Sequence, residues 1–304
     1  MSPKVVVVVL NWNMPADTIE CIESCRQLHY DAYEIVLVDN HSEDDSVKQF
    51  RARFPDLTII ENPENLGYAG GNNVGLRYGL ERGAEYVFLL NNDITLEREC
   101  LSRLVAAAGK YPDAGILAPK VLYYDDRTTI NSLGTSMDWL RLRPYLGECN
   151  TRDDGRFSSV LEKDILVGCA LLLWRSMLEK VGLIDERFFI FHEEADWCLR
   201  SLKNGFRNLV VPEAVIYHKA SKTMRKFSTV TNYYSIRNFL YFTRKNATPM
   251  NWIKTRIGLA YLVFKNLFLF VVGVAEQRRM QKAFFLGLWD YACGRMGKCR
   301  RTFA

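Results

Sequence analysis

The sequence of 304 residues lacks the patterns that mark several common protein classes. No CxxC pair occurs among its eight cysteines, and no cysteine–histidine cluster has the spacing of a zinc site. Internal repeats and low-complexity tracts are also missing. Together with 48% apolar and 25% charged residues, this excludes a disordered chain, a collagen-like repeat and a coiled-coil rod. The length allows one large α/β domain with an appendage, or two modest domains.

Acidic residues are almost missing from the last part of the chain. Residues 219–304 contain only Glu276 and Asp290 against 17 lysines and arginines, a net charge of +15. Residues 1–218 contain 23 lysines and arginines and 33 acidic residues, a net charge of −10. We therefore expect the acidic part not to bind nucleic acid, and the basic part to need an anionic partner.

The chain begins with an apolar run that is similar to the core of a signal peptide. The run from Val5 to Leu10 is too short for that role, and no small-residue cleavage site follows it. We expect this run to be a buried strand. With no signal peptide predicted, we also expect reduced cysteines and a cytoplasmic location.

Short apolar segments alternate with helical patterns through the acidic part. Each apolar segment is followed by polar residues, which predicts a helix-covered parallel sheet with a ligand crevice at the carboxyl ends of its strands. The expected strands are residues 4–10, 34–38, 57–60, 86–90, 165–173 and 209–211. Residues 123–163 have weak periodicity and predict an irregular insertion or lid. Helical patterns dominate from residue 229 onward.

Two polar clusters of the first hundred residues fall where this sheet would place its crevice. Residues 39–45 follow the second strand, where Asp39 can accept hydrogen bonds from a base or a ribose, or simply cap the next helix. Residues 65–73 contain three glycines and three asparagines. They fit neither GxGxxG nor the P-loop, which disfavours a dehydrogenase or a kinase. Two interpretations explain these glycines and asparagines. The backbone approaches a phosphate closely, or the segment is a plain tight turn.

Two further clusters carry carboxylates. Asn91-Asn92-Asp93 follows a buried strand, and its oxygen atoms suit a divalent cation that bridges phosphates, although strands commonly end in such residues. Residues 188–197 carry three carboxylates after an aromatic run. Mutual repulsion would raise one pKa there and favour a general base acting on a hydroxyl. An ordinary acidic first turn of a helix is the alternative.

Six segments in order resemble the family 2 glycosyltransferases, and within them the bacterial rhamnosyltransferase-type members. The segments are VVVLNWN, VDNHSEDDS, ENPENLGYAGGNNVGL, FLLNND, GLIDERFFIFHEEADWCLR and YHKASKT. The resemblance covers about residues 4–245. It implies an α/β fold of the GT-A type, a nucleotide-diphospho-sugar transferase fold with a mostly parallel central sheet flanked by helices. It also implies inverting transfer and a need for Mg²⁺ or Mn²⁺.

The resemblance implies contacts to the nucleotide sugar, residue by residue. Asn11 and Asp39 match the contacts to the nucleotide base, with Ser42 nearby. Three further residues match the loop that lines the nucleotide and donor: Asn65, Gly71 and Asn72.

The resemblance also implies a metal site and a catalytic base. Residues 91–93 match the DxD motif, with Asn92 near the ribose and Asp93 as the metal ligand. Asn91 replaces the first acid of that motif, so Asp93 must supply more of the negative charge that balances the metal cation. His218 matches a histidine that some members use as a further metal ligand.

The resemblance assigns the catalytic base to the second residue of an acidic pair, which is usually Glu-Asp in the family. The pair is Glu193-Glu194 here, so the base would be Glu194, with a side chain one methylene longer. Asp196 is the rival candidate for the same role.

We expect residues 1–225 to form the catalytic domain and residues 226–304 to form a basic, helical, membrane-associating extension. Residues 257–275 approach the length of about 20 residues that spans a bilayer. Lys265 at their centre disfavours spanning. An in-plane helix or hairpin fits better, with four cations facing anionic headgroups: Arg295, Lys298, Arg300 and Arg301. A soluble appendage on the catalytic domain or on another subunit stays open.

The sequence thus predicts a sugar transferase, peripheral on the inner, cytoplasmic face of the cell membrane, that acts in cell-surface polysaccharide synthesis. It would move L-rhamnose from dTDP-rhamnose to a hydroxyl of a glycan or polyprenyl-linked glycan. Donors such as UDP-glucose, UDP-galactose or a galactofuranose nucleotide keep the same fold. A catalytically silent membrane-bound scaffold and a homo-oligomer also stay open.

Overall fold

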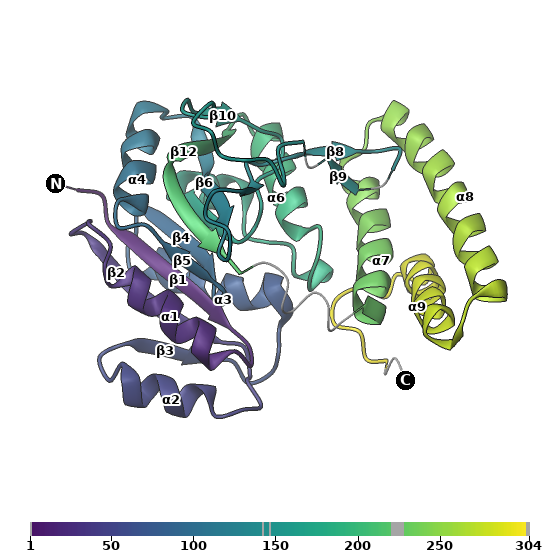
Figure 1. Cartoon of the computed structure of the whole chain (residues 1–304), viewed down its shortest axis with the longest axis horizontal. Coiled ribbons are helices and arrows are strands. Elements are labelled where there is room, and N and C mark those ends of the chain that lie inside the picture. The colour runs from purple at the N-terminus through teal and green to yellow at the C-terminus, as the bar shows by residue number, and fades with distance from the viewer. Residues whose placement is uncertain (1, 142, 146, 220–227, 302–304) are drawn as a thin grey trace.

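The computed structural model describes residues 2–141, 143–145, 147–219 and 228–301. An α/β lobe is followed by three long helices that lie beside it (Figure 1). The expected helical extension is therefore confirmed. The expected domain boundary after residue 225 lies outside the described residues.

The apolar runs of the sequence form the centre of one mixed sheet. Its strand order is β10-β12-β6-β11-β4-β1-β2-β3, with β5 added beside β12 and β7 beside β6. The pairs among β1 to β4, and the β6–β12 pair, are parallel, whereas β11 runs antiparallel between β4 and β6. The strands are β1 (Val5–Asn11), β2 (Tyr33–Asp39), β3 (Thr58–Glu61), β4 (Tyr86–Asn91), β5 (Ile94–Leu96), β6 (Ala114–Tyr123), β7 (Ile130–Ser132), β10 (Leu161–Glu162), β11 (Ala170–Trp174) and β12 (Arg207–His218).

Strand β6 is a central strand that the sequence analysis missed. Gly115, Pro119 and Lys120 interrupt its apolar run, so no continuous strand pattern appears. In the fold, Lys120 forms an ion pair with Asp153 at 2.6 Å. Pro119, which has no N–H to donate, lies next to an irregular step in the β6–β12 register. Tertiary partners thus compensate for each residue that hides the strand.

Helices cover both faces of the sheet. The side chains of β1 alternate between the two faces: Val5, Val7 and Val9 pack on one side, and Val6 and Val8 on the other. The first side carries α1 (Pro15–Cys25), α2 (Ser46–Arg53) and α4 (Cys100–Lys110). The second carries α3 (Gly67–Glu81), α5 (Arg175–Val181) and α6 (Glu193–Lys203). A core on each side explains the continuous apolar run of β1.

Helix α3 lies close to the sheet because one of its faces is made of glycine. Gly71, Gly75 and Gly79 recur every fourth residue, which places them on one side of the helix. A Cβ added at Gly75 would overlap Val8 Cγ1, and one added at Gly79 would lie 2.7 Å from Val87 Cγ2. The glycine-rich segment expected to be a loop is therefore largely the first turns of α3.

The expected insertion over residues 123–163 is mostly irregular. It contains β7, β10 and a small antiparallel pair, β8 (Ser136–Asp138) and β9 (Arg143–Tyr145). The turn between β8 and β9 approaches the C-terminal helices, because Trp139 stacks on Phe242 with ring centroids 5.4 Å apart.

Three helices form the C-terminal part: α7 (Ser228–Asn246), α8 (Pro249–Val272) and α9 (Ala275–Ala292). Helix α7 stands between the α/β lobe and the α8–α9 hairpin (Figure 1). Its lobe-facing residues pack with Phe188 and Ala195, and other residues of α7 pack with Phe284 of α9.

Three of the four cations expected to face headgroups form ion pairs within the protein. Arg295 and Arg301 form ion pairs with Asp290, at 3.3 and 2.9 Å. Lys298 pairs with Glu64 of the α/β lobe at 3.3 Å. All three side chains stay exposed to solvent, so their contact with headgroups stays a prediction.

We predict that Gly75→Ala destabilises the fold, because the new methyl group overpacks the contact between α3 and β1 at a cost of about 1–3 kcal/mol. Alanine regains about 1 kcal/mol over glycine inside a helix, so the net loss is up to about 2 kcal/mol, against a net gain for a glycine with open space around it. Chemical denaturation measures the difference. Gly109→Ala in α4 is the matched control, because nothing lies within 4 Å of its added Cβ. Equal stability of the two variants would contradict the close packing of α3.

Candidate active site

The ends of β1 and β2 bring three of the predicted residues together. Asn11 and Asp39 are aligned in the β1–β2 register. Asn11 Nδ2 donates hydrogen bonds to Asp39 Oδ1 at 2.8 Å and to Ser42 Oγ at 2.9 Å. The backbone N–H and the hydroxyl of Ser42 both donate to the Asp39 carboxylate. The three side chains form one polar group at the carboxyl edge of the sheet.

Asn92 joins this group from the end of β4. Its Nδ2 donates to Asn11 Oδ1 at 3.2 Å and to Thr18 Oγ1 at 2.9 Å. Thr18 Oγ1 in turn donates to Asn11 Oδ1 at 2.7 Å. The sequence analysis missed Thr18, because a threonine inside a helix carries no signal until the fold places α1 over the strand ends.

Asn40 holds the segment that leads into α3. Its Oδ1 accepts hydrogen bonds from Asn62 Nδ2 and from the backbone N–H of Leu66, both at 3.0 Å. Its Nδ2 donates to Asn65 Oδ1 at 3.2 Å and to the carbonyl of Gly67 at 3.0 Å. The side chain of Asn65 is therefore held by Asn40, the residue after Asp39, and its contact with the nucleotide donor stays a prediction.

Gly71 and Asn72 lie inside α3. A Cβ added at Gly71 would lie 2.7 Å from Leu10 Cδ1, so this glycine serves the packing of helix on strand. Asn72 is buried and its Nδ2 donates to the backbone carbonyl of Tyr68 at 3.0 Å. Donor contacts by these two residues stay a prediction.

Asp93 and His218 come together although 124 positions separate them in the sequence. The antiparallel pairing of β5 with β12 places His218 opposite Ile94, and Asp93 Oδ1 lies 3.3 Å from His218 Nε2. His218 Nδ1 lies 3.4 Å from Asn131 Oδ1. A proton on Nδ1 satisfies Asn131 and leaves the Nε2 lone pair for a cation.

The donor set of Asp93 and His218 fits a divalent cation that substrate oxygens complete. Within the described residues, no group of three or more histidine, cysteine or acidic side chains could hold a metal alone. A carboxylate and a neutral imidazole are two ligands, and Mg²⁺ sites of this kind obtain the rest from phosphate oxygens and water. The pair therefore fits a metal that binds together with a phosphorylated ligand.

Glu193 and Glu194 occupy the first turn of α6 with little solvent around them. The Oε2 atom of each is buried and makes no hydrogen bond with the described part of the chain. Burial raises the pKa of both carboxyl groups, and the charge on Glu194 raises the pKa of Glu193 further. A carboxylate with a raised pKa is a stronger base, which suits proton abstraction from a hydroxyl.

The metal pair and the glutamate pair face the same edge of the sheet. Burial raises the pKa of the Cys169 thiol to about 12, and the charges on both Asp93 and Glu194 add to this shift. The carbonyl of Cys169 accepts a hydrogen bond from the N–H of Asn91 at 2.9 Å. A Cβ added at the neighbouring Gly168 would lie 3.5 Å from Glu194 Cβ, so the segment directly before β11 contacts both the end of β4 and the start of α6.

The loop before Glu193 has an unusual backbone. Phe189, Phe191 and His192 have φ angles of 66°, 71° and 71°, in the left-handed region that side chains other than glycine rarely adopt. Such conformations persist only where the surroundings hold them, and they cluster at functional sites.

Helix α7 holds this loop from the C-terminal side of the chain. The buried Asn238 Nδ2 donates to the carbonyls of Phe188, Ile190 and Phe191 at 2.7, 2.6 and 3.2 Å. Arg237 Nη2 donates to the carbonyl of Phe188 at 3.2 Å. The sequence analysis gave these two residues no role, because nothing in a helical pattern marks which loop its polar side chains will meet.

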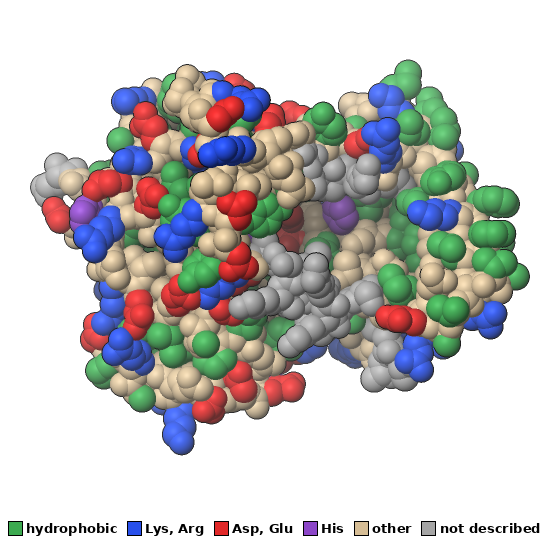
Figure 2. All heavy atoms as spheres, in the orientation of Figure 1, with side chains coloured by type: hydrophobic (Ala, Val, Ile, Leu, Met, Phe, Trp, Pro, Cys, Tyr) green, Lys and Arg blue, Asp and Glu red, His purple; other side chains and the backbone are tan. Residues whose placement is uncertain are grey.

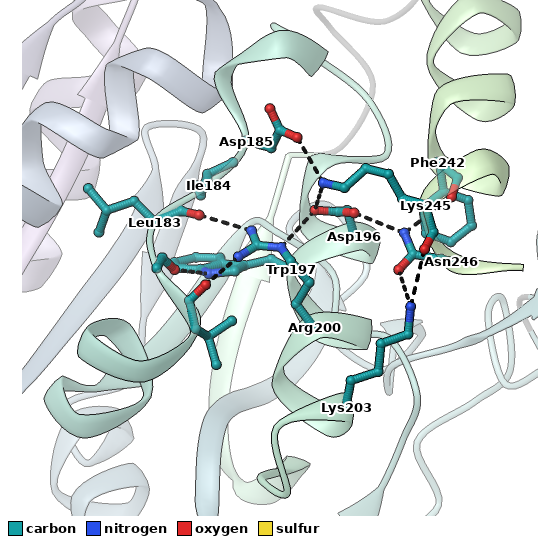
Figure 3. A network of polar contacts seen from close by, with 12 residues as sticks. Leu183, Ile184, Asp185, Asp196, Trp197, Arg200, Lys203, Phe242, Lys245 and Asn246 are labelled. Carbon is teal, nitrogen blue, oxygen red and sulfur yellow. Dashed lines mark hydrogen bonds and ion pairs between the residues drawn. The ribbon is translucent and has the colours of Figure 1, made fainter.

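Asp196 points toward α7 rather than toward the strand ends (Figure 3). Its carboxylate is fully buried and accepts from Arg200 Nε at 2.9 Å, Lys245 Nζ at 2.8 Å and Asn246 Nδ2 at 2.9 Å. Lys245 Nζ also donates to Asp185 Oδ2 at 2.8 Å. Asp196 thus joins α6 to α7 through a balanced network of charges.

Comparisons with known proteins agree with this arrangement. The family described as glycosyl transferase family 2 matches residues 5–182. A dTDP-rhamnosyl transferase, RfbF of Shigella flexneri, is 23% identical over 82% of this chain and 83% of its own length. An N-acetylglucosaminyl-diphospho-decaprenol L-rhamnosyltransferase of Mycobacterium tuberculosis is 27% identical over 63% of this chain and 68% of its own.

A solved structure has the same fold over nearly the whole chain. The mannosyltransferase PcManGT of Pyrobaculum calidifontis, in complex with GDP-Man and Mn²⁺, aligns with a TM-score of 0.61 at 16% identity. The alignment covers 97% of this chain and 88% of that protein. The predicted GT-A fold with a C-terminal helical extension is confirmed.

We predict that Asn238→Ala loosens the loop before Glu193. Two or three buried carbonyls lose their donor, which costs about 1–3 kcal/mol of unfolding free energy. Amide hydrogen exchange over residues 188–194 should become faster. Asn232→Ala is the matched control, because Asn232 lies on the same helix but donates to Met280 of α9. Unchanged exchange in the Asn238 variant would contradict the role of α7 in holding this loop.

Proposed function

The chain belongs to glycosyl transferase family 2, and on that premise we propose that it transfers a sugar from a nucleotide diphosphate to a glycan hydroxyl with inversion at the anomeric carbon. The observation that carries the proposal is the segment Gly168-Cys169, because a Cβ added at Gly168 would lie 3.5 Å from Glu194 Cβ and the Cys169 carbonyl accepts from the N–H of Asn91, two residues before Asp93. Inverting transfer needs Glu194 and Asp93 on opposite sides of the reacting carbon.

The proposed donor is dTDP-L-rhamnose. The name of the Shigella flexneri relative, which matches 82% of this chain, supports that choice. Asp39 at the end of β2 is an acceptor for the imide N–H of thymine, and Asn11 and Asn92 are placed beside it for the base and ribose. Uracil presents the same imide, so UDP-sugars are the second candidate donors.

The proposed acceptor is a glycan carried on a lipid diphosphate. The Mycobacterium tuberculosis relative is named for such an acceptor, and it matches 63% of this chain. Cell-surface polysaccharide synthesis is the process that this acceptor implies.

In the proposed reaction, Glu194 Oε2 takes the proton of the acceptor hydroxyl. The hydroxyl oxygen then forms a bond to the anomeric carbon while the bond from that carbon to the diphosphate oxygen breaks on the opposite face. Asp93 and His218 would hold a divalent cation, Mg²⁺ or Mn²⁺, which would neutralise charge on the departing diphosphate. Burial raises the pKa of Glu194 and so makes it a stronger base, and the pKa of Glu193 beside it is raised further by the charge of Glu194.

The partners of Asp196 support Glu194 as the base. Arg200 and Lys245 neutralise Asp196, and Asn246 occupies its other oxygen. Glu194, in contrast, keeps a buried oxygen without a partner among the described residues.

We predict that Glu194→Gln reduces transfer at least a thousandfold while donor binding persists. Asp93→Asn should instead weaken the binding of dTDP-rhamnose in the presence of Mn²⁺ at least tenfold. Transfer is followed by chromatography of the glycan product, and donor binding by isothermal titration calorimetry.

The two variants serve as controls for each other. Full transfer by Glu194→Gln would assign the base elsewhere, with Asp196 as the next candidate. Unchanged Mn²⁺-dependent titration of Asp93→Asn would remove Asp93 from the metal site. A preference for UDP over dTDP in the unaltered protein would replace the proposed donor.

We also propose that α8 lies on the cytoplasmic face of a membrane. Its exposed apolar residues recur at intervals of three and four, which makes one stripe along the helix (Figure 2). The stripe consists of Met250, Ile253, Ile257, Tyr261, Phe264, Leu267, Phe268, Val271 and Val272. Phe264 is the most exposed, at 72%. An uncovered apolar stripe of this length is typical of an interfacial helix.

The contacts of α8 favour an in-plane helix over a spanning one. By length and composition α8 is able to cross a membrane, with 11% of its most apolar window buried. Its other face, however, packs through Leu259, Leu262 and Val263 with a cluster that includes Phe284 of α9. Spanning would also carry Lys265 to the bilayer centre, which costs about 2.5–3.5 kcal/mol.

We predict that the protein floats with vesicles of phosphatidylglycerol in a density gradient, and that Phe264→Asp with Phe268→Asp abolishes flotation. The double variant puts two carboxylates on the stripe and lowers the net charge by two. Lys110→Asp, at the end of α4 on the opposite side of the molecule, changes the net charge equally and should float like the unaltered protein. Flotation of the double variant would exclude the stripe as the membrane contact.

A further inference from the structure

A groove of about 680 Å³ lies between α8 and the turn that joins β8 to β9. Its walls include Leu140 and Arg141 from the turn, and Ile257, Tyr261, Leu262 and Lys265 from α8. The volume falls within the range of about 300–1,000 Å³ that is usual for ligand pockets. The groove lies outside the cluster of carboxylates described above, and no step of the proposed transfer uses it.

The groove combines apolar walls with excess positive charge. Leu140 and Tyr261 are 49% and 64% exposed, so much of their apolar surface has no protein cover. Arg141 has one ion pair, with Asp138 at 3.2 Å, whereas Lys265 pairs with no carboxylate in the described part of the chain. Helix α8 contains no acidic residue. A ligand that fits this groove is apolar along most of its length and anionic at one point.

We propose that this groove binds the lipid carrier of the acceptor, with a prenyl chain along α8 and its phosphate between Arg141 and Lys265. The proposal rests on the proposed function, which calls for a lipid-linked acceptor. Arginine and lysine both bind phosphate through charge-assisted hydrogen bonds, which are stronger than those between neutral groups. An isolated phosphate would leave the apolar walls unused, and an uncharged lipid would leave the two cations unused.

The groove is continuous with the proposed membrane face. Ile257 and Tyr261 belong both to the groove and to the exposed stripe of α8. A prenyl chain can therefore pass from the acyl region into the groove without crossing water, which would cost about 0.8 kcal/mol for each CH₂ group exposed.

An aromatic wall connects the groove to the carboxylates. Trp139, next to Leu140, stacks on Phe242 of α7 with an interplanar angle of 13°. The Phe242 ring in turn lies 6.0 Å from the ring of His192, which directly precedes Glu193. Phe242 is fully buried, so these contacts fix the turn that carries Leu140 and Arg141 relative to the loop before Glu193.

The test uses farnesyl phosphate, below its micelle concentration, and isothermal titration calorimetry on the full chain. Arg141→Glu with Lys265→Glu should weaken binding at least tenfold, because both cations become anions. Lys254→Glu with Arg256→Glu is the matched control: it makes the same charge change on α8 at two exposed residues that do not line the groove. This control should bind within threefold of the unaltered protein. Melting temperatures of both double variants confirm that they fold.

Three results would overturn the proposal. The first is equal weakening in both double variants, which would show general attraction to a basic helix. The second is binding of inorganic phosphate as tight as that of farnesyl phosphate, which would show an anion site without a lipid. The third is equally tight binding of farnesol, which would remove the role of the two cations. Hydrolysis of dTDP-rhamnose by the unaltered protein, with no lipid present, tests the proposed function separately.

Discussion

The burial of Glu193 and Glu194 side by side is the constraint on which much of the structure depends. Each carboxylate has one buried oxygen with no hydrogen-bond partner among the described residues, which is costly, and the repulsion between the two groups adds to the cost. The start of α6 reduces this cost, because free N–H groups and the helix dipole favour negative charge there. The strained loop before Glu193 aims both side chains, and Asn238 keeps that loop in place. The position of the loop that leads into α6 therefore depends on α7.

The need to neutralise buried carboxylates also explains part of the uneven distribution of charge along the chain. Part of the positive charge after residue 218 is directed inward: Lys245 balances Asp185 and Asp196, and Arg301 balances Asp290. Other cations of this part are exposed on α8 and α9, namely Lys254, Arg256, Lys265, Arg278, Arg279 and Lys282. The basic extension thus has two tasks, since it neutralises buried acids of the fold and presents positive charge beside an apolar stripe.

Local patterns predicted the strands whose sequences are continuous. Val5–Asn11 and Tyr86–Asn91 read directly as buried strands, because each is apolar along its whole length and polar where it ends. Strand β6 was missed, because a proline, a lysine and a glycine break its pattern and only the neighbouring strands and Asp153 compensate for them. The early start of α3 was missed for a related reason. Glycine favours loops when read alone, and its use here is visible only against Val8.

The sequence by itself determined the chemistry that lies at the strand ends. Asn11, Asp39 and Asp93 each follow an apolar run, and parallel strands carry such ends to one edge of a sheet, so local order was enough to bring them together. Only the tertiary structure decided that Glu193 and Glu194 each keep an unpartnered oxygen among the described residues whereas Asp196 does not. Glu194 and Asp196 are two positions apart on one helix, yet Asp196 meets Lys245 and Glu194 meets none of the described polar side chains. The physical reason is that a carboxylate's partners come from segments about 50 residues away, and no local pattern specifies the distance or direction of such contacts.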